Sequence, residues 1–385
     1  MRTLATVTAS ASSLPTPSPT ASPKVRPRRR PSDWQWQLQH AVRTAARLAE
    51  VFRLSPAELA GALAAERDGF PISITPYYLS LADPNDPACP IRRQVVPHAL
   101  EAREVPGDLR DPLGEAAHEV APDLVQRYPD RALLFATDRC AVYCRFCTRS
   151  RLVGAGGGAR SLDRLAPAFA YLRAHPEVRD VIVSGGDPLA LATERIVALV
   201  RTLRDIGSIE TIRLATRVPV ALPQRITPEL VRALRPFHPL WVMTHFNHPK
   251  ELTNESRRAC RRLADAGFPV MNHTVLLRGI NDDSATLGAL FRGLVKERVR
   301  PYYLLQADPV RGTGHLRTPL ATGLRIMAEL QGRLSGIALP KFIVDTPGGL
   351  GKVPVSPDYV IERGEGRVRF RTHRGVEVDY LDPPD

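Results

Sequence analysis

The stretch Cys140-Ala-Val-Tyr-Cys144-Arg-Phe-Cys147, here called the cysteine triplet, places three thiols in one short segment directly after a strand-like apolar run at 132–138. Thiolates are soft ligands that suit iron–sulfur clusters, zinc or cuprous copper. Zinc ligands tend to come as two separated pairs, so a tight triplet favours a cluster over a tetrahedral zinc site. Because four thiolates saturate a cluster of four irons, three would leave one iron open for another ligand.

Strand candidates alternate with amphipathic stretches of helical length from residue 131 onward. This alternation predicts parallel strands joined by crossover helices, the α/β class. Polar or glycine-rich residues follow each strand, and barrel enzymes carry their chemistry at that end of the strands. Six units rather than eight predict a partial (β/α)6 barrel of the TIM type. The predicted strands are 132–138, 180–184, 211–216, 240–245, 270–277 and 301–306, and the predicted helices lie near 162–174, 194–206, 229–234, 255–266 and 287–297.

The chain divides into four predicted regions. Residues 1–31 are rich in Ser, Thr, Pro and Ala and lack large apolar groups, so we expect a disordered basic tail. Residues 32–124 predict an N-terminal helical region, with helical spacing from Leu38 to Leu48 and a cap at Ser55. The barrel is expected over 125–362, and a short strand-rich C-terminal extension over 363–385.

Composition limits the class of protein. With 385 residues and 43% hydrophobic residues the chain can bury a large core. The net charge is +13, of which six charges lie in the first 31 residues, so +7 remains for the folded part. That remainder is spread along helices without an aromatic-interleaved stripe, so we expect no nucleic-acid partner. No apolar run approaches the length of a membrane span, and the odd cysteine count favours a metal centre in the reducing cytoplasm over disulfides.

Two further motifs carry candidate chemistry. Ser184-Gly185-Gly186-Asp187 follows the second predicted strand, where glycines would let a ligand approach the backbone and Asp187 offers a carboxylate. A purely structural turn is the alternative. The second motif, Asp345-Thr-Pro-Gly-Gly-Leu-Gly-Lys352, lacks the glycine and the Ser or Thr of a phosphate-binding loop. Its lysine could instead form a Schiff base with an aldehyde.

Taken together, these stretches closely resemble the lysine 2,3-aminomutase family of radical S-adenosylmethionine (SAM) enzymes, over about residues 33 to 380. The spacing of the cysteine triplet matches the superfamily, and the other stretches match this family within it. They are Tyr128-Pro-Asp-Arg131, Thr148-Arg149, Ser184-Gly-Gly-Asp187, Pro223-Gln-Arg-Ile-Thr227, Thr244-His-Phe-Asn-His-Pro249, Val275-Leu-Leu-Arg-Gly-Ile-Asn-Asp282, Arg300-Pro-Tyr-Tyr303 and Pro347-Gly-Gly-Leu-Gly-Lys352.

The resemblance implies three cofactors: a [4Fe-4S] cluster, SAM and pyridoxal 5′-phosphate (PLP). It implies that Cys140, Cys144 and Cys147 bind the cluster and that Lys352 holds PLP as an internal aldimine. For SAM, the resemblance implies that its methionine amino group is bound by Ser184, Gly185, Gly186 and Asp187, and that His245 makes a further contact. For PLP, it implies that Arg131 binds the phosphate and that His273 lies near the cofactor, where relatives have glutamine.

The implied substrate is a basic amino acid. By resemblance, Arg149 binds the substrate carboxylate, and Asp308 with Asp345 binds the ε-ammonium group of lysine. Two carboxylates in a dry pocket are costly unless a cation neutralises them, so such a pocket selects a positive tail and repels glutamate. An arginine guanidinium also fits carboxylates. Lysine is therefore preferred over arginine through the resemblance alone, and Leu305, where relatives have an aromatic or polar ring, could retune the pocket.

The expected reaction moves the 2-amino group of L-lysine to C3, giving β-lysine, through a 5′-deoxyadenosyl radical and a PLP–lysine aldimine. The alternatives are the same shift on L-arginine, or on lysine destined for elongation factor P. A non-catalytic iron–sulfur or RNA-binding protein is the alternative from another class. Expected partners are the amino acid, an electron donor such as flavodoxin or ferredoxin, and further copies of the chain as a homo-oligomer. The subunit zinc site of longer relatives is not expected, since no cysteine follows Cys260.

Overall fold

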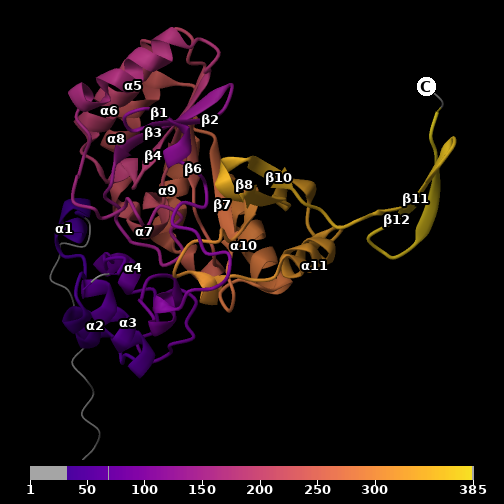
Figure 1. Ribbon diagram of the computed structural model, residues 1–385, viewed down its shortest axis with the longest axis horizontal. Coiled ribbons are helices and arrows are strands. Elements are labelled where there is room, and N and C mark those ends of the chain that lie inside the picture. Colours follow the sequence, from indigo (N-terminus) through magenta and orange to yellow (C-terminus); the bar gives the residue numbers. More distant parts are fainter. Residues whose placement is uncertain (1–32, 68, 384–385) are drawn as a thin grey trace, which may run out of the picture.

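Seven consecutive strands, β3 to β9, lie parallel and form the middle of a ten-stranded sheet. The computed structural model describes residues 33–67 and 69–383. Strands β1 and β2 extend one edge of the sheet in antiparallel fashion, and β10 extends the other (Figure 1). Within the described residues no pairing joins β1 to β10, so the barrel stays open. The strands are β1 Glu119–Ala121, β2 Leu124–Tyr128, β3 Arg131–Thr137, β4 Asp180–Gly185, β5 Thr211–Ala215, β6 Leu240–Thr244, β7 Val270–Leu276, β8 Val299–Gln306, β9 Lys341–Thr346 and β10 Gly351–Pro354.

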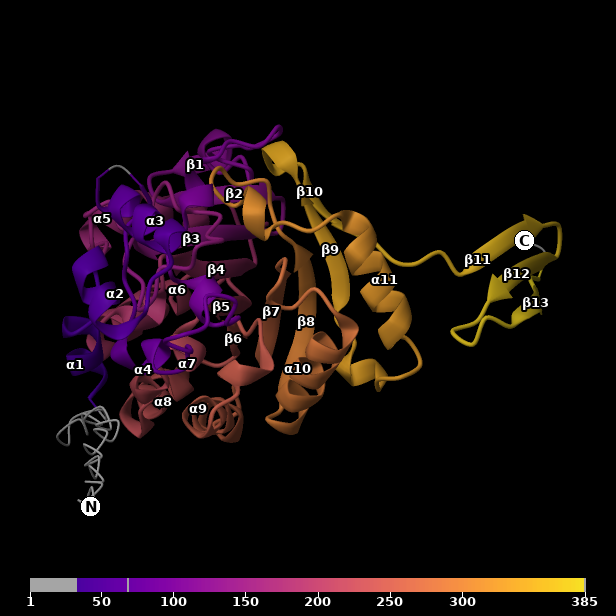
Figure 2. The same cartoon turned by 90° about the horizontal axis from the view of Figure 1, so that it is seen from below.

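Helices cross between successive parallel strands and cover the outer face of the sheet (Figure 2). Their buried side chains follow helical spacing: in α10 these include Leu287, Leu290 and Leu294. Six strand–helix units run from β3 to α11, which confirms the predicted partial (β/α)6 barrel and its six strands. The crossover helices are α5 Leu162–Ala174, α6 Thr193–Arg204, α8 Pro228–Leu234, α9 Asn254–Asp265, α10 Ser284–Lys296 and α11 Leu320–Leu330, with the short α7 Val218–Ala221 before α8.

The sixth helix, α11, and the seventh parallel strand, β9, were not among the predicted elements. Gly323 lies inside α11 on its buried face, and a glycine inside a helical pattern weakens the sequence signal for a helix. The glycine is needed for packing, since a Cβ atom there would lie 2.1 Å from the ring of Phe342 on β9. Strand β9 matters for function because it carries Asp345 near its carboxyl end.

The N-terminal region consists of short helices packed against the barrel: α1 Trp34–Gln39, α2 Ala45–Val51, α3 Pro56–Arg67 and α4 Pro76–Leu79. The helical spacing predicted from Leu38 to Leu48 spans a break, because Val42 leaves the helix and pairs with Ile74. Ser55 caps α3 as predicted, accepting a hydrogen bond from the Glu58 amide. Strand β2 begins at Leu124, so the predicted boundary at 124/125 falls at the start of this strand.

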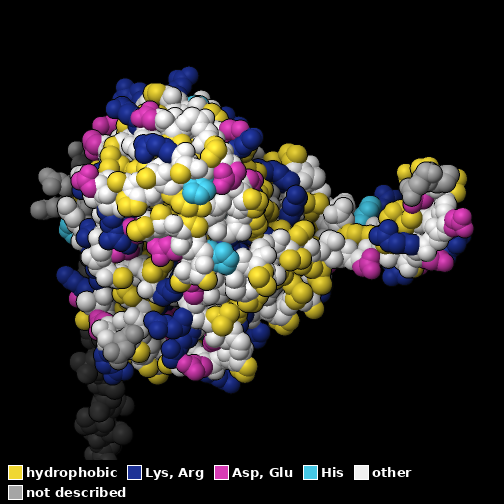
Figure 3. Space-filling model, turned by 45° about the horizontal axis from the view of Figure 1, so that its top comes forward, with side chains coloured by type: hydrophobic (Ala, Val, Ile, Leu, Met, Phe, Trp, Pro, Cys, Tyr) yellow, Lys and Arg dark blue, Asp and Glu magenta, His cyan; other side chains and the backbone are white. Residues whose placement is uncertain are grey.

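The C-terminal residues form a separate three-stranded sheet of β11 Val360–Gly364, β12 Arg367–Arg371 and β13 Glu377–Leu381. We call this sheet the C-terminal arm. It stands away from the body of the molecule on a thin connection (Figures 1 and 3). The boundary predicted at 362/363 is misplaced, because it cuts through β11. The arm exposes apolar side chains, and Leu381 is 80% exposed.

The predicted disordered tail at 1–31 lies outside the residues that the structure describes. None of the helices in 33–67 and 69–383 is both long and apolar enough to cross a membrane.

Candidate active site

The cysteine triplet lies in the loop that follows β3, at the carboxyl end of the parallel sheet. Its three thiols are free. The N-terminal region fixes this loop: the amides of Tyr143 and Arg145 donate to the carbonyls of Ser73 and Gln94, each at 2.9 Å. The Arg145 guanidinium is also paired with Glu101. The loop that presents the thiols is therefore held in place by residues far away in the sequence.

The donor set of this loop fits an iron–sulfur cluster. The three thiols of the cysteine triplet all line the same cavity. Soft thiolates that line one cavity suit a cluster of several irons.

Gly185, the last residue of β4, and Gly186 both have a packing reason to be glycine, in line with the structural turn given above as the alternative. Their predicted contact with SAM stays a prediction. A Cβ atom on Gly185 would lie 2.3 Å from the Thr137 carbonyl oxygen, and one on Gly186 would lie 2.4 Å from the Arg139 carbonyl oxygen. Gly185 also has a φ of +107°, which favours glycine. The amides of Gly186 and Asp187 donate to these same two carbonyls. The glycines thus allow the loop after β4 to pack against the start of the cysteine loop.

Asp187 is buried, and its carboxylate is already occupied by the protein. It accepts hydrogen bonds from the Thr216 hydroxyl at 2.6 Å, the Arg217 amide at 2.7 Å and the Leu189 amide at 3.0 Å. Burial raises its pKa to about 6, and these hydrogen bonds oppose that rise. The described contacts make Asp187 a brace between the loops after β4 and β5. Its predicted contact with SAM stays a prediction.

Two histidines present unpartnered nitrogens to the cavity. The Nε2 atoms of His245, just after β6, and of His273, on β7, are buried and have no hydrogen-bond partner within the described residues. Burial, with a contribution from the Arg217 cation, holds the pKa of His245 well below its usual range. Burial and then the Lys352 cation lower the pKa of His273 to about 3. Both rings are therefore neutral and can each offer one hydrogen bond to a ligand.

Lys352 lies on β10, directly opposite Asp345 on β9. Its Nζ contacts one carboxylate oxygen of Asp345, and Arg127 donates to the other at 2.7 Å. The backbone amide of Lys352 donates to the Tyr128 hydroxyl at 2.9 Å. Asp345 is thus paired with two cations in this structure, and its predicted contact with the substrate stays a prediction.

Asp308 differs from Asp345 because no side-chain hydrogen bond or ion pair of this carboxylate is found within the described residues. Burial and then the neighbouring carboxylate of Asp345 raise its pKa to about 7, against the opposing effect of the cations Lys352, Arg127 and Arg149. An added cation in the cavity would favour the ionised form. Asp308 is therefore the carboxylate most available to a positively charged substrate.

The two predicted arginines hold different partners. Arg149 donates to Glu115 at 2.7 Å and to the Ser184 hydroxyl at 3.2 Å. Arg131 donates to its neighbour Asp130 at 2.8 Å, and its guanidinium lies 3.8 Å from the centre of the Tyr128 ring.

One cavity of about 590 Å³ joins these groups. It reaches from the loops at the carboxyl ends of the strands to Arg131 and Asp180, the first residues of β3 and β4. The cysteine triplet and Lys352, separated by more than 200 positions in the sequence, open onto this same space. The predicted site residues that line it are Arg131, Cys140, Cys144, Cys147, Arg149, Ser184, Gly185, Gly186, Asp187, His245, His273, Asp308, Asp345 and Lys352.

The structure adds cavity residues that sequence reasoning assigned no role. Arg217 contacts the Cys144 thiol, Arg127 pairs with Asp345, and Glu115 pairs with Arg149. Arg217 could have been suspected, because it directly follows a predicted strand. Arg127 lies on β2, next to the Tyr128 stretch, and Glu115 lies before β1. Neither residue is part of a quoted motif, and only their contacts identify them.

Comparison with known proteins agrees with this geometry. A family model described as the radical SAM superfamily matches residues 134–287, and a model described as lysine-2,3-aminomutase matches residues 327–385. L-lysine 2,3-aminomutase of Clostridium subterminale is 46% identical over 91% of this chain and 84% of its own length. The Bacillus subtilis protein of that name is 44% identical over 91% of this chain and 74% of its length. Glutamate 2,3-aminomutase of Clostridioides difficile is 39% identical over 92% of this chain and 83% of its length.

The open barrel, the thiol loop and the first family match define a radical SAM enzyme, which uses a [4Fe-4S] cluster and SAM. Within that superfamily, the identity over most of both chains is decisive. The protein belongs to the lysine 2,3-aminomutase family and is an isomerase.

Proposed function

We propose that the protein moves the 2-amino group of L-lysine to C3, using PLP held at Lys352. The observation that supports this most directly is the shared cavity, which places the cysteine triplet, Lys352 and Asp308 around one space. The radical chemistry of the cluster and the amine chemistry of an aldehyde cofactor must meet at the substrate. A single cavity meets that requirement.

The residues around Lys352 fit PLP. The cavity carries the amine of Lys352 together with the cations Arg131 and Arg213, which suit a phosphate dianion. The orphaned Nε2 of His273 lies beside them, and its ring stacks 5.5 Å from the ring of Tyr303. When bound, PLP would supply a carbonyl for the substrate amine and a conjugated system that tolerates an unpaired electron nearby.

The charges of the cavity favour lysine over glutamate. We infer that Arg149 holds the substrate carboxylate, and that Glu115 orients Arg149 through the contact described above. We infer that Asp308 receives the ε-ammonium group, since a carboxyl group with a pKa near 7 gains most from a nearby cation. Once Lys352 releases Asp345, one oxygen of that carboxylate also becomes available to the substrate. A second carboxylate on the substrate would be repelled here.

Arginine stays the second candidate substrate. Two carboxylates in one cavity also suit a guanidinium group, which can donate to both. Lysine destined for elongation factor P is a further alternative.

The decisive experiment is anaerobic incubation of the reconstituted protein with reductant, SAM and PLP, and with lysine, arginine or glutamate in parallel. We expect β-lysine to form from lysine, detected by amino-acid analysis. Conversion of glutamate with none of lysine would refute the proposed roles of Asp308 and Asp345. An omission of PLP that leaves the rate unchanged would refute the proposed role of Lys352.

We also propose three finer points on partners and location. The exposed apolar residues of the C-terminal arm, among them Val378, Tyr380 and Leu381, support assembly with further copies of the chain. A one-electron donor such as flavodoxin or ferredoxin would supply the electron that reduces the cluster. The five free thiols fit the reducing cytoplasm.

A further inference from the structure

Arg217 is a buried cation in direct contact with the cysteine triplet. It lies between β5 and α7 and is 8% exposed. Its Nη1 lies 2.6 Å from the Cys144 sulfur. A guanidinium in this place can donate a hydrogen bond to a cluster thiolate, so it belongs to the immediate surroundings of the metal centre.

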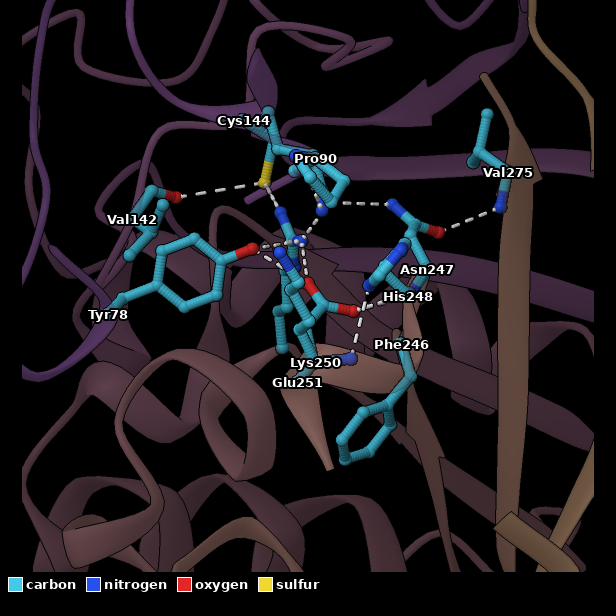
Figure 4. Close-up of polar contacts among 12 residues, drawn as sticks. Tyr78, Pro90, Val142, Cys144, Phe246, Asn247, His248, Lys250, Glu251 and Val275 are labelled. Carbon is cyan, nitrogen blue, oxygen red and sulfur yellow. Dashed lines mark hydrogen bonds and ion pairs between the residues drawn. The ribbon is translucent and has the colours of Figure 1, made fainter. Parts of the chain in front are cut away.

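The other side of Arg217 is fixed by three oxygen atoms, two of which belong to Tyr78 and Glu251 (both labelled in Figure 4). Its Nη2 donates to the Tyr78 hydroxyl at 3.0 Å, to Gln94 Oε1 at 2.5 Å and to Glu251 Oε1 at 2.8 Å. These partners come from the N-terminal region and from the loop after β6. The guanidinium is therefore held in one orientation against the thiol.

Glu251 is itself fully buried and held by groups other than Arg217. It accepts hydrogen bonds from the Tyr78 hydroxyl at 2.6 Å and from the amides of Asn247 and His248 at 2.6 and 2.9 Å. A buried carboxylate with this many donors keeps its position. The Arg217 cation beside Cys144 is thus paired, on its other side, with the fixed Glu251 carboxylate.

We propose that Arg217 raises the reduction potential of the iron–sulfur cluster and that Glu251 limits this rise. Reduction adds one electron, supplied by an external one-electron reductant, and no bond to the protein forms or breaks. Cluster potentials depend on net charge and on hydrogen bonds to the sulfurs. A buried cation that donates to Cys144 stabilises the added negative charge, and the Glu251 anion behind it acts in the opposite direction. Arg217 is a positioning and tuning residue, and nothing in the aminomutase assignment requires it.

The test is a potentiometric titration of the reconstituted full-length protein, without SAM, PLP or substrate. Titanium(III) citrate serves as the one-electron reductant, and the signal of the reduced cluster is followed by electron paramagnetic resonance at measured iron content. For Arg217→Met we expect the ratio of reduced to oxidised cluster at a fixed potential to fall about tenfold, which corresponds to about 59 mV for a one-electron couple. Glu251→Gln should shift the ratio in the opposite direction, and Arg217→Lys should fall less than Arg217→Met.

Arg225→Met is the matched control. Arg225 is also a buried arginine, but it donates to the carbonyls of Leu189 and Leu191, and no thiol of the described part of the chain is among its hydrogen-bond partners. Its loss should lower stability and leave the potential unchanged. An unshifted midpoint in Arg217→Met with full iron would overturn the proposal, as would shifts of the same sign in Arg217→Met and Glu251→Gln. If Arg217→Met fails to bind iron, a midpoint potential of Glu251→Gln equal to that of the wild type is enough to overturn the proposal. Because PLP and lysine are absent, failure here leaves the proposed function untouched.

Discussion

Replacing Asp308 by asparagine tests the electrostatics of the cavity. The ordinary pKa of this carboxyl group is 3.8, and burial together with the Asp345 charge raises it to about 7. A shift of about 3 units corresponds to about 4 kcal/mol between the protonated and ionised forms, at about 1.36 kcal/mol per unit. The protein without substrate carries this cost at neutral pH because, among the residues that the structure describes, no cation is paired with Asp308.

The sign of the pH dependence follows from proton binding. Between about pH 4 and about pH 7 the folded protein keeps a proton on Asp308 that the unfolded chain has lost. The free energy of unfolding therefore falls as pH rises through this range. Asparagine does not titrate, so from about pH 5 to about pH 7 the wild type should lose about 2 kcal/mol relative to Asp308→Asn.

Urea denaturation of both proteins across that pH range, without cofactors or substrate, measures the difference. Asp205→Asn, at an exposed position, serves as the control and should show no such trend. A stability difference between wild type and Asp308→Asn that stays constant with pH would refute the reasoning. In the complete enzyme, the same substitution should weaken lysine binding about 10–100-fold, since hydrogen bonds to charged groups contribute about 1.5–3 kcal/mol.

Three further perturbations follow from the geometry. Lys352→Ala should abolish the absorption of covalently bound PLP while iron content stays at the wild-type level; covalent PLP that persists would disprove the role of Lys352. Gly186→Ala should displace the cysteine loop and cost about 1–3 kcal/mol in denaturation experiments, because the new Cβ would meet the Arg139 carbonyl oxygen at 2.4 Å. Gly207→Ala, where a Cβ meets nothing within 4 Å, is the neutral control, and equal losses at both glycines would contradict this explanation. Tyr380→Asp in the C-terminal arm should lower the mass measured by light scattering, and an unchanged mass would remove the arm from the proposed contact between copies.

The network around Arg217 also links parts of the chain that the predicted regions treat separately. Tyr78 and Gln94 belong to the N-terminal region, and Glu251 belongs to the barrel. Side chains of the N-terminal region therefore position the Arg217 cation beside Cys144, and through the proposed role of Arg217 they would act on the cluster. Substitutions in this region can be expected to change the cluster as well as stability.

Much of the architecture was predictable because it depends on local patterns. The six strands of the partial barrel and the five helices between them follow from apolar periodicity, which each segment carries by itself. The two elements that were not predicted, α11 and β9, show the limit of this signal. Gly323 weakens the helical pattern of α11, and a glycine is required there because the ring of Phe342 on β9 packs against it. The cysteine triplet and Lys352 were likewise predicted from their motifs, and the structure places both on one cavity.

The residue pattern alone indicates the type of chemistry, through three soft ligands at one spacing, a lysine on a glycine turn, and acidic and basic groups near strand ends. Which of these charges meet follows from the fold and cannot be read from the pattern. Arg217 lies 73 positions from Cys144, and Arg127 lies 218 positions from Asp345. Such contacts cannot be predicted from residue spacing, because they form only where the parallel sheet brings distant loops together around one cavity. There the low dielectric makes each pairing strong, so the fold sets the pKa values of Asp308 and His273 and positions the cation beside the thiols.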